Sequence, residues 1–415
     1  ESEVGTVFGC GDPTRTPVPH VCIVFIVLLF ASDDMVERIL LVKLAALGDA
    51  VMASTLVPAI RARWPRAELA WVTGQGIAPL VRSLQGVDRV IEVDEAALLG
   101  GRRMAAARAM VRAWGEIGRG WDLALVAHTD ARYALLARAS GASDIRRFAD
   151  KRGPRAGRWH GAEYARLLQD NVDAAGDVAG DVAGDVAGDV AGDVAGDVDA
   201  NADLGVDANA AARPQANSTD PPLAALRTDA LPAARIPAGG GALILVAPGG
   251  GRNVLRDDAL RRWPIISWQS AVETLVADGH RVVAIGGVGD AAEGAACAEA
   301  GATDLTAGTS LLELMALIRA SDVVVTHDAG TLHLAILLRR PTVALFGPTR
   351  PDERIPSGAA VTVLSRANGL ACAPCYDGQR YAICASNRCL NAVPSHEVAH
   401  AVQSLLSQPR SALRA

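Results

Sequence analysis

The chain has 415 residues, with 40 basic and 46 acidic side chains, a formal charge of −6 and an apolar share of 50%. This length suits two or three domains with a sizeable buried core. The acidic balance, and the lack of an arginine stripe with interleaved aromatic residues, argue against a nucleic-acid partner. Aromatic residues make up 4%, and the abundance of Ala, Val, Leu and Gly favours a parallel sheet covered by helices over an antiparallel sandwich.

The N-terminal residues 1–34 are predicted to lie outside the fold. Their apolar run, Val21 to Ala31, has 11 residues, whereas a membrane-spanning helix needs roughly 20. The run also lacks the basic cluster and the small-residue cleavage site of a signal peptide. We interpret residues 1–34 as an extension that arises from the assigned gene start, with a tail that touches a membrane as the second interpretation.

The first half of the chain alternates predicted strands with predicted helices. Short apolar runs indicate four strands, at Arg38–Leu44, Ala67–Gly74, Val87–Asp94 and Trp121–His128. One helix is predicted from Val51 to the residue before Pro65, and another for Arg132–Ser140. Because strands that alternate with helices favour parallel βαβ units, residues 35–172 are expected to form an N-terminal Rossmann-like domain.

A low-complexity segment follows this domain. From Ala175 to Val198 the sequence repeats Ala-Gly-Asp-Val six times. A period of four is too short for a solenoid, glycine opposes a helix, and the regular acids keep the segment solvated. Together with the Pro-rich stretch after the repeat, residues 173–238 are predicted to be a disordered linker.

The second half repeats the alternation of strands and helices. The predicted elements are a strand entering a glycine loop at Gly241–Gly251, a helix at Ser267–Gly279, a strand at His280–Gly287, a helix beginning after Thr309 or Ser310, a strand at Asp322–Thr326, a helix at Thr331–Leu338 and a strand at Pro341–Gly347. Residues 239–408 are therefore expected to form a second domain, with a Cys-rich loop at 372–389. The predicted fold is α/β, with two doubly wound parallel-sheet domains facing a central cleft.

The segment from Thr326 to His333 places polar residues where a strand ends and a helix begins. A helix N-terminus offers unpaired N–H groups and a partial positive charge, which favour phosphate. Gly330 leaves room for a ligand, His333 is within reach of the same anion, and Asp328 is suited to a ribose hydroxyl. The alternative is that Asp328 and Thr331 only cap the helix and His333 is a surface histidine.

Two other strand ends carry candidate residues. Asp49 follows the first strand, either as a helix cap or as a carboxylate that accepts a proton from an attacking hydroxyl. Gly249, Gly250 and a third glycine follow the strand that opens the second domain, and Arg261 comes soon after. Glycines clear space and arginines neutralise phosphate, although neither a Walker loop nor a dinucleotide fingerprint is present. The alternative for the glycine loop and the arginines that follow it is a flexible basic loop.

Four of the seven cysteines lie close together, at Cys372, Cys375, Cys384 and Cys389. The C-x2-C start is typical of a metal knuckle, and four thiolates suit a structural zinc or iron ion. Two disulfides and four reduced thiols are the alternatives. The uneven distribution of cysteines favours a reducing cytoplasm over a secreted disulfide scaffold.

Four motifs in the same chain order resemble glycosyltransferase family 9, the bacterial heptosyltransferases of lipopolysaccharide synthesis. They are RILLVKLAALGDAVMASTLVPAIRARWP from Arg38, RRWP from Arg261, DAGTLHLAILLRRPTVALFGPTRP from Asp328, and the CAPC tail from Cys372. The resemblance implies a GT-B fold with the donor on the C-terminal domain and the acceptor on the N-terminal one. It also implies inversion by direct displacement, with no cofactor for catalysis.

The resemblance also implies a role for individual residues. Asp49 is the general base in this interpretation. The residues that bind the donor are Asp328, Gly330, Thr331, His333, Arg261, Gly249, Gly250 and Asp290. Arg261 replaces a lysine that relatives often carry, which keeps the charge and changes its geometry.

The implied donor is ADP-heptose or a similar nucleotide sugar, and the implied acceptor is a lipopolysaccharide core or another glycan. The implied location is the cytoplasm, at the inner face of the membrane through a peripheral contact. The alternatives are a relative that moves another sugar to a glycan or protein, a non-catalytic binder of nucleotide sugars, and a nicotinamide-dependent oxidoreductase.

Overall fold

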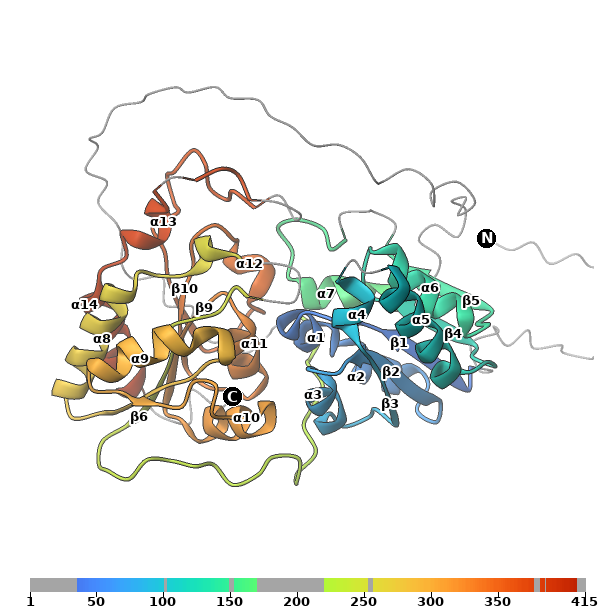
Figure 1. Ribbon diagram of the computed structural model, residues 1–415, viewed down its shortest axis with the longest axis horizontal. Coiled ribbons are helices and arrows are strands. Elements are labelled where there is room, and N and C mark those ends of the chain that lie inside the picture. Colours follow the sequence, from blue (N-terminus) through green and yellow to red (C-terminus); the bar gives the residue numbers. More distant parts are fainter. Residues whose placement is uncertain are drawn as a thin grey trace, which may run out of the picture. The chain divides into compact units, whose positions relative to one another are not determined.

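The computed structural model describes residues 36–100, 103–148, 153–169, 220–252, 257–376, 381–384 and 386–408. The N-terminal extension 1–34 and the Ala-Gly-Asp-Val repeat lie outside the described residues. Within these ranges the chain forms two parallel sheets, each with helices on both faces (Figure 1). The prediction of two doubly wound α/β domains is confirmed.

The first sheet has the strand order β3-β2-β1-β4-β5, and all its strands are parallel. Its strands are β1 (Arg38–Val42), β2 (Glu68–Gly74), β3 (Arg89–Val93), β4 (Leu123–Val126) and β5 (Asp144–Arg147). Its helices are α1 (Leu47–Ala53), α2 (Leu56–Arg63), α3 (Ala78–Ser83), α4 (Glu95–Leu99), α5 (Arg103–Ile117), α6 (Ala131–Ala139), α7 (His160–Ala165) and the short η2 (Arg166–Leu168). The strand order reverses between β1 and β4, which makes this point the topological switch of the sheet.

The second sheet has the order β11-β10-β9-β6-β7-β8 and is also fully parallel. Its strands are β6 (Leu243–Ala247), β7 (Arg281–Ala284), β8 (Thr303–Asp304), β9 (Val323–His327), β10 (Thr342–Leu345) and β11 (Val361–Leu364). Its helical segments are η3 (Ala259–Arg261), α8 (Ile265–Ala277), η4 (Val288–Asp290), α9 (Ala291–Glu299), α10 (Leu311–Ala320), α11 (Gly330–Leu337), α12 (Pro351–Arg354), α13 (Arg388–Asn391) and α14 (Ser395–Leu406). Its switch point lies between β6 and β9.

The central strands are apolar on both faces because helices cover both sides of each sheet. In β6, Ile244 and Val246 pack with α8 and α14, whereas Leu245 packs with α10 and α11. In β1, Leu40 and Val42 pack with α4, α5 and α6, and the alternate residues of the strand face α1 and α2. The continuous apolar runs in the sequence are therefore a direct consequence of two-sided burial.

The observed helices and strands differ from the predicted ones in a few places. The single helix predicted after the first strand is two helices, α1 and α2, which are separated at Ser54 and Thr55. The edge strands β5, β8 and β11 were not anticipated, because they are short and most of their side chains are partly or fully exposed. The predicted start of α10 is confirmed, since Ser310 caps it and forms a capping box with Glu313.

The prediction that all of residues 173–238 form a disordered linker is wrong for residues 220–238. This segment packs along the N-terminal domain, where Ala224 is buried and Leu226 pairs with Leu84. Arg227 donates to the carbonyl oxygens of Leu84 and Val87 at 3.2 and 2.7 Å. Leu231 is buried in the same core, so apolar side chains and hydrogen bonds together hold a segment whose prolines resemble those of a linker.

Candidate active site

The candidate residues lie at the carboxyl ends of strands that flank the two switch points. Gly249 and Gly250 follow β6, and Asp328 follows β9, the neighbouring strand in the second sheet. Asp49 lies in α1, directly after β1. Since ligands of doubly wound sheets bind outside the carboxyl ends of the strands at the switch point, this position supports the predicted donor site.

The contact between helices α1 and α11 brings Asp49 of the first domain to Asp328 and His333 of the second. A Cβ atom on Gly48 would lie 2.4 Å from Cδ2 of His333, and one on Gly330 would lie 2.8 Å from Cδ2 of Leu47. Gly330 therefore makes room for Leu47 of the other domain, whereas the sequence had suggested room for a ligand. The two glycines let the N-terminal turns of the helices touch, which places Asp49 beside the Asp328 and His333 cluster.

Asp49 forms an ion pair with the buried Lys43. Its carboxylate accepts a hydrogen bond of 2.9 Å from Nζ of Lys43, whose side chain is 1% exposed, while the Asp49 side chain is 33% exposed. Burial by itself would raise the pKa of Asp49, but Lys43 and Arg354 hold it well below its ordinary value. The N-cap of α1 is Ala46, so Asp49 does not act as the cap. The carboxylate is ionised and partly open to solvent, as a general base requires.

Asp328 is the centre of a buried charge cluster. Its Oδ2 lies 3.8 Å from both Nη1 of Arg261 and Nε of Arg354, and its Oδ1 lies 3.9 Å from Nε2 of His333. Oδ2 of Asp328 and Nε of Arg354 have no hydrogen-bond partner among the described residues. Burial alone would raise the pKa of Asp328, but the two arginines lower it. Arg261 and Arg354 are therefore the two cations at this carboxylate that an anionic ligand could meet.

The predicted helix caps at this site are not observed. The N-cap of α11 is Ala329, and within the described ranges no side chain caps the helix. Thr331 lies partly exposed in the first turn. The free amide groups of α11 therefore remain available to an anion. This excludes the interpretation in which Asp328 and Thr331 serve only as caps.

His333 was expected to lie within reach of the anion, and the structure places it in the first turn of α11, with Nε2 3.9 Å from Oδ1 of Asp328. The side chain is buried, and burial lowers the pKa of His333 to about 4. The imidazole is therefore neutral near pH 7 and can donate or accept a hydrogen bond. Arg261, Arg354 and the N-terminus of α11 supply the positive charge instead.

Three residues of the site, Lys43, His160 and Arg354, were missed in the sequence. Lys43 pairs with Asp49, and Arg354 donates from Nη1 to Nδ1 of His160 at 2.9 Å. Burial lowers the pKa of His160 to about 3, so its ring is neutral and acts as the acceptor. A lysine within the apolar strand RILLVKL was a readable signal, because a buried lysine needs a partner. His160 and Arg354 carry no such signal, since only the tertiary fold buries them.

The glycine loop after β6 is held by Asp290 and His327. One carboxylate oxygen of Asp290 accepts from Gly250 N at 3.0 Å and from Nη1 of Arg252 at 2.7 Å. His327 accepts from Trp263 N at Nε2, so its Nδ1 carries the proton and donates to Gly249 O at 3.0 Å. These bonds indicate that Asp290 shapes the loop, and a direct contact with the donor nucleoside stays a prediction.

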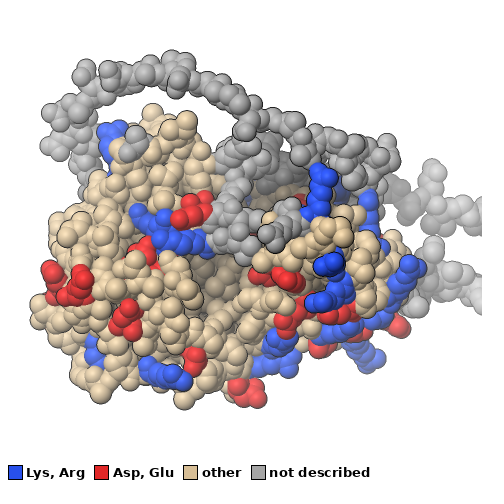
Figure 2. Space-filling view, viewed as in Figure 1, with Lys and Arg blue, Asp and Glu red and all other residues tan. Residues whose placement is uncertain are grey.

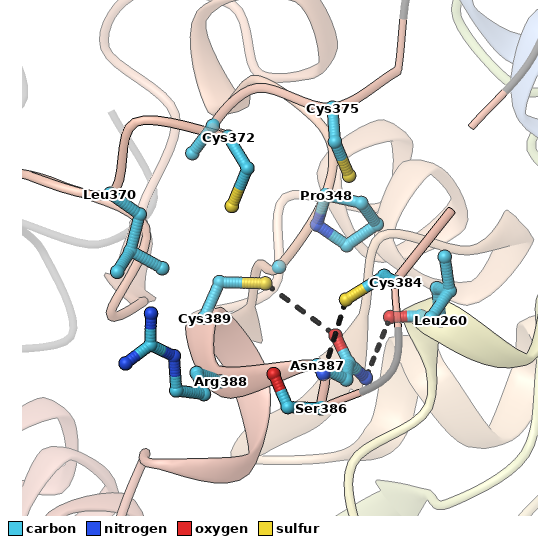
Figure 3. Close-up of a pocket in the computed structure, with 12 residues that line it drawn as sticks. Leu260, Pro348, Leu370, Cys372, Cys375, Cys384, Ser386, Asn387, Arg388 and Cys389 are labelled. Carbon is cyan, nitrogen blue, oxygen red and sulfur yellow. Dashed lines mark hydrogen bonds between the residues drawn. The ribbon is translucent and has the colours of Figure 1, made fainter. Parts of the chain in front are cut away.

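The four cysteines line one cavity of about 70 Å³ at the end of the second domain (Figure 3). Cys389 is buried, Cys372 is exposed, and all four are free thiols. In the part of the chain that the structure describes, no three His, Cys, Asp or Glu side chains are placed to hold a metal ion. The thiols converge without forming a closed metal site.

We expect Gly48→Ala to lower affinity for a nucleoside diphosphate about tenfold while the melting temperature stays near that of the wild type. The new Cβ atom would collide with the His333 ring, whereas alanine in a helix interior is favourable by roughly 1 kcal/mol. Calorimetric titration with ADP measures the first effect and thermal unfolding the second. Gly76→Ala is the matched control, because its Cβ would approach its nearest neighbour at 3.6 Å. Affinity equal to that of the wild type would contradict the contact between α1 and α11.

Comparison with known proteins places this geometry in context. Residues 242–383 match the family described as Glycosyltransferase family 9 (heptosyltransferase). The chain is 32% identical to lipopolysaccharide heptosyltransferase 2 of Escherichia coli K12 over 116 residues, which are 26% of this chain and 33% of that protein. The sequence match thus spans about a third of the length of the curated relative.

The solved structures extend the likeness to nearly the whole described chain. The ADP-heptose lipopolysaccharide heptosyltransferase II of E. coli has a TM-score of 0.58 at 18% identity, covering 89% of this chain and 98% of that one. An E. coli heptosyltransferase solved with ADP has a TM-score of 0.59 at 15% identity, covering 89% and 100%. The predicted GT-B fold is confirmed by this likeness.

Proposed function

We propose that the chain is a member of glycosyltransferase family 9, whose family model matches residues 242–383, and that it is an inverting glycosyltransferase that moves a heptose or a related sugar. The proposed donor is a nucleoside-diphosphate sugar, with ADP-heptose as the first candidate, and the proposed acceptor is a lipopolysaccharide core or another glycan. One observation supports this proposal above the others. The Asp49 carboxylate of one domain lies beside the cationic Asp328 cluster of the other, through the contact of α1 with α11.

Each side of this arrangement supplies one requirement of sugar transfer. The acceptor hydroxyl must lose a proton as it attacks, and the ionised Asp49 carboxylate is the proposed base. The leaving diphosphate needs stabilisation of its charge, which Arg261, Arg354 and the amide groups of α11 supply. Since arginines and a helix N-terminus perform this role, we propose that the transfer itself needs no metal ion. The neutral His333 would donate a hydrogen bond to the donor.

A donor screen tests the proposal directly. ADP-heptose, UDP-sugars and GDP-sugars are compared by thermal shift, and each stabilising donor is then incubated with core-oligosaccharide acceptors. We expect stabilisation by one nucleotide class and release of its nucleoside diphosphate only when an acceptor is present. Stabilisation without release, with every acceptor, would identify a non-catalytic binder of nucleotide sugars.

We also propose a peripheral contact with the inner face of the cytoplasmic membrane, through α5 and the start of α6. The exposed apolar side chains on these helices are Met104, Val111, Trp114 and Leu135, and the exposed basic ones include Arg108 and Arg112. Lys and Arg side chains gather over the N-terminal domain, among acidic ones, on the face drawn in Figure 2. Exposed apolar side chains beside exposed arginines on one helix suit an anionic lipid surface. Among the helices of the described ranges, none has the length and apolarity needed to cross a bilayer.

A structural zinc or iron ion at Cys372, Cys375, Cys384 and Cys389 remains part of the proposal. Four soft sulfur ligands that share one cavity favour a metal ion. In the described structure the thiols are not placed to bind one, so the loop would have to close further around the ion. We expect purified protein to contain about one zinc or iron per chain and Cys375→Ser to lose it, by elemental analysis. Metal content near zero would remove the proposal, and a thiol titration would then separate free thiols from disulfides.

A further inference from the structure

The cysteine-rich loop 372–389 reaches the arginine of the proposed donor site. Nε of Arg261 donates to the phenol oxygen of Tyr381 at 2.6 Å, and the guanidinium lies 5.8 Å from the centre of the Tyr381 ring. The phenol in turn donates to Oδ2 of Asp258 at 3.4 Å. Burial raises the pKa of Tyr381 above its ordinary value, so the phenol remains protonated and can make both bonds. Tyr381 therefore links Arg261 to Asp258.

A second contact holds the backbone just before Arg261. Nδ2 of Asn387 donates to the carbonyl oxygen of Leu260 at 3.1 Å (Figure 3). The same asparagine accepts from the thiol of Cys389 at 3.5 Å, and its backbone N–H donates to Sγ of Cys384 at 3.2 Å. Asn387 has φ of 44°, in the left-handed region that asparagine tolerates better than most residues. Asn387 thus connects two of the thiols to the short helical turn that carries Arg261.

Arg261 depends on such support, because its own segment is short. It ends the three-residue turn η3, whose N-cap residue makes no side-chain capping bond within the described ranges. One Nη1 hydrogen is donated to the backbone oxygen of Asp328 at 3.2 Å. Nε is bound to Tyr381 and Nη1 to Asp328, which fixes the guanidinium plane, and among the described residues Nη2 has no hydrogen-bond partner that would compete with a ligand. A planar fork is useful for phosphate only when its plane is oriented in this way.

We propose that the cysteine-rich loop is a positioning element of the donor site, in which Tyr381 and Asn387 orient Arg261 toward the diphosphate. This inference rests on the proposed function, since it assumes that Arg261 binds the donor. The loop then has a role besides stability. A shift of Cys384 or Cys389 would move Asn387, which is hydrogen-bonded to both, and through Asn387 the backbone of Leu260 next to Arg261. Tyr381 and Asn387 are positioning residues here, and neither needs to touch the substrate.

The first test measures ADP binding by calorimetry in Tyr381→Phe, which keeps the ring and removes the phenol oxygen. The loss of one hydrogen bond to a charged group predicts an affinity about tenfold lower. The same substitution in an Arg261→Met background should then add almost nothing, because the group that it orients is absent. Equal losses in both backgrounds, or no loss in the single variant, would overturn the inference.

A matched pair of asparagines separates positioning from general loop stability. Asn387 and Asn391 each donate from Nδ2 to a backbone carbonyl, but the acceptor of Asn391 is Ser386, within the loop itself. Asn387→Asp should weaken ADP binding several-fold and raise the donor KM more than it lowers kcat, whereas Asn391→Asp should bind ADP as the wild type does. Equal effects of the two variants would show that the loop acts only through stability.

The design also distinguishes this inference from the function on which it rests. A wild-type protein that binds none of ADP, GDP and UDP would overturn the assignment of the donor site, and the inference with it. A wild-type protein that binds one of them, with Tyr381→Phe and Asn387→Asp unchanged, would overturn the inference alone.

Discussion

Asp49→Asn is expected to lower the rate of sugar transfer about 10³-fold while ADP affinity stays within about twofold of the wild type. The amide has nearly the same shape as the carboxylate but cannot accept the proton of the acceptor hydroxyl. It also removes the charge that Lys43 meets at 2.9 Å, so thermal unfolding should accompany the rate measurement. Transfer is measured as nucleoside diphosphate released with a core acceptor.

Asp94→Asn is the matched control for this variant. Asp94 also follows a strand of the first sheet, and its side chain caps α4 by accepting from Ala97 N at 2.9 Å. Asparagine caps a helix about as well as aspartate, so rate and stability should both remain. A rate loss in Asp49→Asn accompanied by an equal loss of ADP affinity would assign Asp49 to donor binding and end its role as the base.

Lys43→Met is expected to move the acid limb of the pH–rate profile to higher pH. In the wild type Lys43 and Arg354 hold the pKa of Asp49 well below its ordinary value, so the base stays ionised through mildly acidic pH. Without Lys43, burial dominates and the pKa of Asp49 rises, so protonation removes the base at a higher pH than before. The rate on the plateau should also fall, because nothing then orients the carboxylate.

The profile of kcat/KM between about pH 4.5 and 8 checks this prediction, since it reports the ionisations of the free enzyme. Lys43→Arg keeps the charge and should keep the acid limb near its wild-type position, although the larger guanidinium fits the buried site less well. Thermal unfolding at each pH separates a shifted limb from simple unfolding. An acid limb in Lys43→Met that coincides with that of the wild type would show that the pair does not tune the base.

Much of the fold was predictable, because parallel strands buried on two faces have a signature that survives in a single sequence. The runs RILLV in β1 and VVVTH in β9 are almost continuously apolar, and glycine, proline and helix caps mark where such runs end. The edge strand β5, with the sequence DIRR, has no such signature because half of its surface faces water. Residues 220–238 were misread because their prolines and their position after the repeat suggested a linker, although Ala224 and Leu231 are buried and Arg227 binds two carbonyl oxygens of the N-terminal domain.

The position of the candidate site was predictable in part, because some of its residues directly follow predicted strands. Asp49 and Asp328 each follow a strand, and the carboxyl ends of parallel strands share one edge of a sheet. Their charges were harder to foresee, because a pKa depends on neighbours far along the chain. His333 has an ordinary pKa of 6.5, at which part of the imidazole is charged near neutral pH, yet burial lowers the pKa to about 4.

The sequence by itself determined the alternation of strands and helices, the two domains and the resemblance to a family, because these depend on local periodicity and on motifs of adjacent residues. Only the tertiary structure decided which groups meet. It paired Lys43 with Asp49, placed Arg354 against His160 of the other domain, and brought Tyr381 of the cysteine-rich loop to Arg261. Such contacts join residues separated by as many as 194 positions, and no local pattern encodes them. Their geometry follows from the packing of two sheets whose strand ends face the same site.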